Sequence, residues 1–397
     1  MMMRSTGKRT NLITFLGALC MLLSAVEYAI PKPVPFMRLG LANLPVLLAL
    51  YIALSASEYF LLVALKILTQ ALVSGTLFSY VFLFSLAGSL SSATVMYALF
   101  KAGRQRGSAF KSGTAEEGIC KSEGRGRGAF SAVGISLGGA LANNLAQLAL
   151  SYFMLFGDST RFIAPVLLTA GAITAFLLGL FAEAFMSRSL WFASVCAPQA
   201  LQADDALSAE SASENGKTEP ASGSGTAQED IGKSEGLGAG TVRFCAALII
   251  MIAFLLITDV RIKAALTVAF YLAARIRRRK VRILPSLIII VTVTAAALLS
   301  PAGRVFVRLG SFPVTLGALE TGLSRALTLV GMVFLSQYGT SGSVKLPGKA
   351  GVLLESVFNW FGVLTTKRLS FKKGKVISTL DEHLMKTYNS FHIRKNS

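Results

Sequence analysis

Charged residues are scarce in this 397-residue chain, at 15% of the composition, whereas soluble proteins contain roughly 25%. Tryptophan and histidine occur only twice each. The scarcity of charge, together with 53% hydrophobic residues and a mean hydropathy of +0.61, excludes an ordinary soluble domain. We therefore predict an all-α polytopic membrane protein.

Motifs for catalysis, metal binding and ATP hydrolysis are also missing. No stretch matches G-x-x-x-x-G-K-[ST], so any ATP-driven work must come from other chains. The only adjacent aspartates are Asp204 and Asp205, in a polar stretch, and both histidines lie close to the C-terminus. The four cysteines have neither metal-site nor redox spacing. We expect no catalytic residues, no cofactor and no metal site.

Basic residues outnumber acidic ones, 39 to 20, which gives a net charge of +19. No basic stretch is interleaved with aromatic residues in a nucleic-acid-binding motif, so we expect no nucleic-acid partner. Lysine and arginine gather instead in the cytoplasmic loops of membrane proteins. We interpret the excess as a sign of membrane topology.

Ten apolar stretches have the length or composition of membrane spans. Every large basic cluster then lies at the N-terminus or after an even number of crossings, and therefore on one side of the membrane. This places both termini in the cytoplasm and the chain in the cytoplasmic membrane. The expected spans are residues 11–30, 39–54, 59–75, 78–100, 130–156, 162–185, 242–258, 263–276, 283–299 and 315–338.

Polar, Gly- and Ser-rich stretches divide these spans into units. We expect a six-span unit at residues 1–190, with a flexible cytoplasmic loop insertion at 101–128. A disordered linker at 191–241 precedes a unit of about four spans at 242–340. Residues 341–397 form a basic cytoplasmic tail.

The stretch "IPKPVPFMRLGLANL", residues 30–44, interrupts the first apolar region with three alternating prolines. Proline removes a backbone donor and ends a helix, so this stretch predicts an extended outer hairpin. Arg38 and Asn43 follow at the start of the second span. Two interpretations remain open: a tight turn with a snorkelling arginine, or the rim of an outward-facing pocket.

Three carboxamides, Asn143, Asn144 and Gln147, occupy about one turn of the fifth span. Such groups are unfavourable in a membrane unless they meet one another, water or a ligand. Hydrogen bonding between helices, at about 0.6 kcal/mol per bond, is the structural interpretation. A role in ligand binding is the functional one.

Two ionisable residues, Glu27 and Lys66, lie in the first and third spans. A buried ammonium needs a partner, and Glu27 is the candidate. Gln70 shares a helix face with Lys66. The pair is either structural or part of a site in which Lys66 and Arg38 meet an anionic group.

Three motifs carry a family resemblance: "VEYAIPKPVPFMRLGLANLPVLLAL", "FSLAGSLSSATVMY" and "GGALANNLAQLALSYFMLF" with the "FIAPVLLTAGAITAFLLGLFA" that follows it. Over about residues 12–185 the chain resembles the Gx transporter family, whose members are also labelled heptaprenyl diphosphate synthase component I. That family is similar to the substrate-capture S components of energy-coupling-factor (ECF) transporters. More weakly, residues 242–340 are similar to the transmembrane T component, although the Ala-Arg-Gly motifs that dock ATPases are absent.

This resemblance implies a six-helix bundle that binds a small anionic or amphipathic molecule on its outer side. Its partners would be the lipid bilayer, ABC-type ATPase subunits and a further coupling subunit. The candidate substrate-binding residues are Glu27, Arg38, Asn43, Lys66, Gln70, Asn143, Asn144 and Gln147. The alternative is a non-catalytic membrane partner in polyprenyl diphosphate or quinone synthesis, because aspartate-rich magnesium motifs for prenyl condensation are missing.

Overall fold

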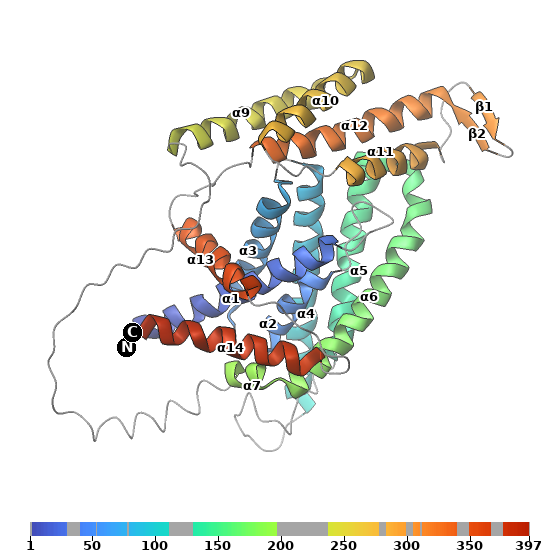
Figure 1. Ribbon diagram of the computed structural model, residues 1–397. Helices are drawn as coiled ribbons and strands as arrows, with labels where there is room; N and C mark the ends of the chain where they lie inside the picture. Colours follow the sequence, from blue (N-terminus) through green and yellow to red (C-terminus); the bar gives the residue numbers. More distant parts are fainter. Residues whose placement is uncertain are drawn as a thin grey trace, which may run out of the picture.

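The computed structural model shows a helical protein with one short β-hairpin (Figure 1). The predicted all-α class is confirmed, with the hairpin as the exception. The described residues are 2–29, 40–52, 54–77, 79–110, 130–196, 237–277, 283–298, 305–309, 312–339, 349–366 and 376–396.

The first unit is a bundle in which α4 and α6 both pack against α5. Helix α6 follows α5 after a π-helical turn, η2, and a 3-10 turn, η3. The elements are α1 (Met2–Ala29), η1 (Leu41–Asn43), α2 (Leu44–Tyr51), α3 (Ala56–Ser74), α4 (Tyr80–Phe110), α5 (Ala132–Ser151), η2 (Tyr152–Phe156), η3 (Gly157–Ser159), α6 (Thr160–Arg188) and α7 (Leu190–Cys196).

Local sequence signals set the ends of α3. The Ser55 hydroxyl accepts from the Glu58 amide at 3.3 Å, and the Glu58 carboxylate accepts from the Ser55 amide at 2.8 Å. This capping box satisfies amides that the first turn leaves without helical partners. Gly75, at φ 63°, ends the helix in a conformation that glycine adopts without strain. Glu58 also pairs with Arg9 at 3.6 Å, so the start of α3 lies beside α1.

Glycines bring α4, α5 and α6 into close contact. A Cβ at Gly179 of α6 would meet the Val133 Cα of α5 at 2.6 Å. A Cβ at Gly88 of α4 would overlap the Asn143 carboxamide oxygen and lie 3.1 Å from the Gln147 amide nitrogen. Small residues of this kind let membrane helices approach closely.

The second unit is arranged around α12, which contacts α9, α10 and α11. Gly331 of α12 lies against the Phe254 ring of α9. In Figure 1 these helices run across one end of the α3–α6 bundle. The elements are α9 (Leu237–Leu256), α10 (Val260–Arg277), α11 (Ile283–Leu298), β1 (Val305–Leu309), β2 (Phe312–Thr315) and α12 (Leu316–Gly339).

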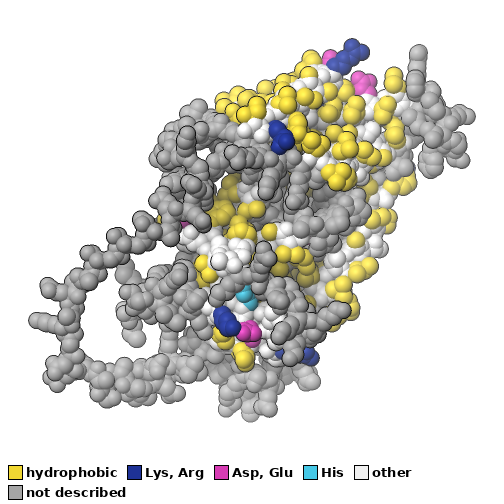
Figure 2. Space-filling model, in the orientation of Figure 1, with side chains coloured by type: hydrophobic (Ala, Val, Ile, Leu, Met, Phe, Trp, Pro, Cys, Tyr) yellow, Lys and Arg dark blue, Asp and Glu magenta, His cyan; other side chains and the backbone are white. Residues whose placement is uncertain are grey.

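Every expected span contains a helix, and several helices are long and apolar enough to cross a bilayer. Helix α2 and the apolar part of α11 are shorter, and α10 carries four basic residues in its 18. Hydrophobic side chains cover much of the described surface of the second unit and of α6 (Figure 2), as lipid-facing helices require. The number of crossings stays a prediction. By length and composition the qualifying runs are Arg9–Glu27, Ala56–Ser74, Tyr80–Gln105, Ala132–Arg188, which holds both α5 and α6, and Leu316–Gly339.

The predicted flexible stretches are partly helical at their ends. Helix α4 continues to Phe110, through the first residues of the 101–128 insertion, because Lys101, Ala102 and Arg104 are good helix formers. Residues 111–129 and 197–236 lie outside the described part of the chain, as do residues 30–39 of the proline-rich stretch.

The predicted tail contains two helices that pack on the first unit, α13 (Lys349–Thr366) and α14 (Val376–Asn396). Apolar residues at helical spacing, among them Val357, Trp360 and Leu364, place one face of α13 in the core beside Phe15. The prediction of a basic tail at residues 341–397 did not include these two helices.

A buried carboxylate fixes α14 to the end of α6. Asp381, 8% exposed, accepts hydrogen bonds from the Leu190 and Trp191 amides at 3.0 Å each, and from the Ser189 hydroxyl. These donors belong to the first turn of α7 and the residue before it. Asp381 therefore caps a helix about 190 positions earlier in the chain.

Replacing Asp381 with alanine should destabilise the protein, because two buried amides and a hydroxyl lose their acceptor. We expect a loss of about 1–3 kcal/mol, measured as a lower midpoint of thermal unfolding in detergent. Glu382→Ala is the matched control, since the Glu382 side chain is exposed and pairs with Lys386 across one helix turn. Equal midpoints for the two variants would contradict the capping role.

Gly88→Ala should lower the unfolding midpoint, because the added methyl group displaces the Asn143 carboxamide. The same substitution in an Asn143→Ala background should have a smaller effect, since the overlapping oxygen is gone and only the Gln147 amide, at 3.1 Å, remains close. This double-mutant cycle isolates the contact between the two residues. A loss of stability that is the same in both backgrounds would show that Gly88 matters for another reason.

Candidate functional site

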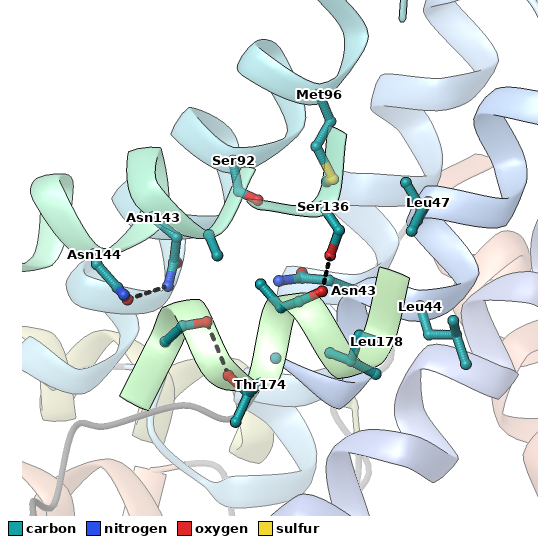
Figure 3. Close-up of a pocket in the computed structure, with 14 residues that line it drawn as sticks. Asn43, Leu44, Leu47, Ser92, Met96, Ser136, Asn143, Asn144, Thr174 and Leu178 are labelled. Atoms are coloured by element: carbon teal, nitrogen blue, oxygen red, sulfur yellow. Dashed lines mark hydrogen bonds between the residues drawn. The ribbon is translucent and has the colours of Figure 1, made fainter. Parts of the chain in front are cut away.

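A pocket lies inside the first unit, between η1, α2, α4, α5 and α6 (Figure 3). Its cavity volume is about 30 Å³, on a measure by which one water needs roughly 10–15 Å³, so it has room for about two water molecules. Apolar and polar side chains share its wall. The lining residues are Gly40, Asn43, Leu44, Leu47, Ser92, Met96, Ser136, Ala140, Asn143, Asn144, Gly171, Thr174, Ala175 and Leu178.

Asn43 reaches the pocket from the turn that starts the second span. Gly40, at φ 82°, allows this turn, and its carbonyl accepts from the Asn43 amide at 2.8 Å. The Asn43 side-chain oxygen accepts a hydrogen bond from the Lys66 ammonium of α3. Lys66 is 5% exposed and also lies 3.5 Å from the Ser89 hydroxyl. Asn43 thus connects the pocket wall to a buried positive charge.

The carboxamides of α5 form a hydrogen-bonded row. The Gln147 amide nitrogen donates to the Asn143 oxygen at 3.2 Å, and the Asn143 nitrogen donates to the Asn144 oxygen at 3.3 Å. The Asn144 nitrogen donates to the Leu167 carbonyl of α6 at 3.1 Å. Gly171 leaves room for Asn144, as Gly88 does for Asn143. Asn143 and Asn144 line the pocket, and Gln147 lies one hydrogen bond behind them.

Three hydroxyls in the wall were not predicted from the sequence. Ser136 donates to the Ala175 carbonyl at 2.8 Å, and Thr174 donates within its own helix. The Ser92 oxygen is buried without a hydrogen-bond partner in the described part of the chain. Ser92 shares a face of α4 with Ser89, a polar spacing in an apolar helix that could have identified it.

The other predicted residues lie away from the pocket wall. Glu27 is buried, at 3% exposed, and Gln70 is half-buried, but neither lines the pocket. The pairing of Glu27 with Lys66 stays a prediction, as do the substrate-binding roles of the whole set. Arg38 lies outside the described residues.

Charged residues of the second unit make local and inter-unit contacts. Asp259 caps α10 by accepting from the Arg261 amide at 2.8 Å. Lys263 donates to the Ser324 hydroxyl of α12 at 3.0 Å. Arg325 reaches the first unit, where it donates to the Leu155 carbonyl at 2.7 Å. This bond joins α12 to the π-helical turn after α5.

The chemistry that the pocket wall offers is hydrogen bonding. Its polar groups are carboxamides and hydroxyls, with an ammonium behind Asn43. Among the described residues, no three His, Cys, Asp or Glu side chains come close enough to hold a metal ion. Amides and hydroxyls both donate and accept, so the wall can bind a small polar molecule from several sides.

Comparison with known proteins assigns the two membrane units separately. Residues 16–115 and 120–185 match the model of a family described as heptaprenyl diphosphate synthase component I. Residues 239–340 match a domain of unknown function, DUF8519, which lends no support to the resemblance to a transporter T component. No curated protein and no solved structure matches the chain. The match over the first membrane unit confirms the family that its motifs predicted there, heptaprenyl diphosphate synthase component I.

Proposed function

We propose that this chain captures a small polar molecule in the Asn43 pocket and passes it across the membrane, driven by separate ATPase subunits. One observation carries the proposal: a pocket lined by carboxamides and hydroxyls lies inside an apolar helix bundle. Polar groups in a membrane bundle are unfavourable and mark sites of binding or transport by default.

Packing between helices explains the carboxamides only in part. The bonds from Gln147 to Asn143 and from Asn144 to the Leu167 carbonyl fit a structural role. An interior built for packing alone would close around these groups, because protein cores leave few voids larger than a water molecule. The space beside Asn43 and Asn143, about 30 Å³ where roughly 10–15 Å³ holds one water, is available to ordered water or to a small polar group of a solute.

Lys66 favours a solute with an anionic or strongly accepting group. Its ammonium holds the Asn43 oxygen, so the Asn43 amide hydrogens remain to donate to a ligand. A positive charge one side chain away, in a region of low dielectric, strengthens that interaction. The predicted small anionic or amphipathic substrate fits this arrangement.

The outer side of the cytoplasmic membrane is the proposed side of capture. Arg9 and Glu58 mark one end of the bundle, where the basic N-terminus is expected in the cytoplasm. At the opposite end, exposed Tyr152 and Phe153 follow α5, and Arg161 lies over the Phe162 ring. Aromatic and basic residues of this kind are typical of a membrane–water interface.

The second unit is proposed to couple the capture bundle to ATPase subunits. Its helices cross the bundle end, and α11 and α12 pack against η2 and α4 (Figure 1). Rotation of the bundle within the membrane, driven through this contact, is the proposed transport motion. The flexible linker expected between the units keeps them at high effective concentration.

A non-catalytic role in polyprenyl diphosphate synthesis is the second candidate. The description of the matched family supports it, as does a second, small cavity of about 20 Å³ with a wholly apolar wall at the junction of the units. An isoprenoid chain would suit such a wall, which includes Phe84, Leu155 and Val293. In that case the chain would hold a lipid precursor for a separate enzyme.

Native mass spectrometry of the full-length chain in nanodiscs tests the proposal. We expect the wild type to release a small water-soluble molecule on denaturation, and the Lys66→Ala/Asn143→Ala double variant to lose at least about 90% of it, as removal of two hydrogen-bonding groups requires. Leu141→Ala, at a lipid-exposed position of α5, is the control and should retain it.

Gel filtration and the unfolding midpoint check that the double variant remains folded. Equal recovery from the wild type and a folded double variant would exclude this pocket as the capture site. Release of an isoprenoid instead would favour the second candidate.

A further inference from the structure

Three buried serines follow one face of α4. Ser85, Ser89 and Ser92 have the i, i+4, i+7 spacing of a single helical stripe, and none is more than 7% exposed. Asn144, Gln147 and Ser151 form a comparable stripe on α5, at 4% exposed or less.

The two stripes lie along the same helix interface. A Cβ at Gly139 of α5 would lie 3.0 Å from the Ser92 oxygen, and one at Gly88 of α4 would lie 3.1 Å from the Gln147 nitrogen. These contacts show that α4 and α5 run antiparallel. Moving back along α4 from Gly88 to Ser85 therefore moves forward along α5, toward Ser151. We call this row of polar side chains, from Ser92 to Ser85 and Ser151, the α4–α5 seam.

Several polar atoms of the seam have no hydrogen-bond partner among the described residues. The Ser85, Ser92 and Ser151 hydroxyls and the Gln147 side-chain oxygen are buried without a hydrogen bond to any described residue. Buried polar groups are nearly always satisfied by protein or ordered water, and leaving one unpaired costs about 1–3 kcal/mol. Four such atoms in one row indicate that water or a polar solute completes their bonding.

The seam leads to the buried lysine and the pocket. Ser89 lies 3.5 Å from the Lys66 ammonium, and Ser92 lines the pocket beside Asn143. From there the polar row continues toward Ser151, the last residue of α5. It therefore runs from the pocket to the bundle end that we expect on the outer side.

The second unit covers that end of the bundle. Phe84, Leu155 and Phe156 of the first unit form one apolar cluster with Val293 and Leu329 of α11 and α12. Beside this cluster, Arg325 donates to the Leu155 carbonyl at 2.7 Å. A charged donor on a backbone carbonyl is a strong contact at an interface that is otherwise apolar.

We infer that α4 and α5 enclose a hydrated seam through which water and small polar solutes reach the pocket beside Asn43. We also infer that the second unit closes the outer end of this seam, where the hydrogen bond from Arg325 to the Leu155 carbonyl, which we call the latch, holds it in place. The seam as a route for substrate rests on the proposed function, whereas its hydration and its closure do not. The second unit would then control access to the pocket as well as couple to partners.

Cysteine accessibility in the full-length chain tests the inference. Single Ser85→Cys and Ser151→Cys reporters are made in a background whose four native cysteines are replaced, and are reacted with a water-soluble methanethiosulfonate sulfonate. The reagent attacks thiolate, which forms only where water reaches the sulfur. We expect both reporters to react, and Leu141→Cys at a lipid-exposed position of α5 to react at least about tenfold more slowly.

Opening of the latch should accelerate the labelling. Arg325→Gln should raise the rates at both reporters about tenfold, the effect of losing one charged hydrogen bond. Arg261→Gln is the matched control, because the exposed Arg261 side chain is on the same unit and should leave the rates unchanged.

Reporters as unreactive as Leu141→Cys in both backgrounds would overturn the hydrated seam. Reactive reporters whose rates are equal in the Arg325→Gln and Arg261→Gln backgrounds would overturn the latch. The two reporters lie on different helices, so if one cysteine variant fails to fold, the other still tests the inference. A chain that binds no solute would fail the native mass spectrometry and could still pass this experiment.

Discussion

Burying amide and ammonium groups between membrane helices is the constraint on which the first unit depends. Lipid supplies no hydrogen-bond partners, so each such group must find one inside the protein or in trapped water and ligand. Lys66 is held by Asn43, and the α5 carboxamides are held by one another and by a carbonyl of α6. The pocket lies where this network meets open space.

Close helix approach makes the network possible. Gly88 and Gly171 provide the room that Asn143 and Asn144 occupy, and Gly179 lets α6 touch the α5 backbone. The same glycines that favour tight packing therefore fix the carboxamides beside the pocket. Packing and binding are not competing explanations here, because the packed glycines position the polar groups.

The sequence predicted the class of protein, the approximate positions of the helices and three residues of the pocket wall. Hydropathy locates the helices because bilayer thickness sets their length. Asn43, Asn143 and Asn144 could be found because carboxamides stand out in apolar runs. The Ser136 hydroxyl could not, since serine is common in membrane helices and only the packing of α5 against α6, where it bonds the Ala175 carbonyl, gives it a place in the pocket wall.

Contacts between distant segments were beyond sequence reasoning. Asp381 caps α7 from about 190 residues away, and Arg325 donates to the Leu155 carbonyl from about 170 residues away. Neither contact leaves a local pattern in the sequence. The helices of the tail were missed for another reason. Apolar residues do recur at helical spacing there, but the basic residues at 367–375 favoured a tail where Trp360 and Leu364 enter the core.

An experimental density map of the full-length chain, purified from its native membrane, tests the central claim most directly. The account predicts density for a small molecule between Asn43 and the α5 carboxamides, within hydrogen-bonding distance of both. A map in which these side chains bond to one another across a closed, empty contact would contradict it.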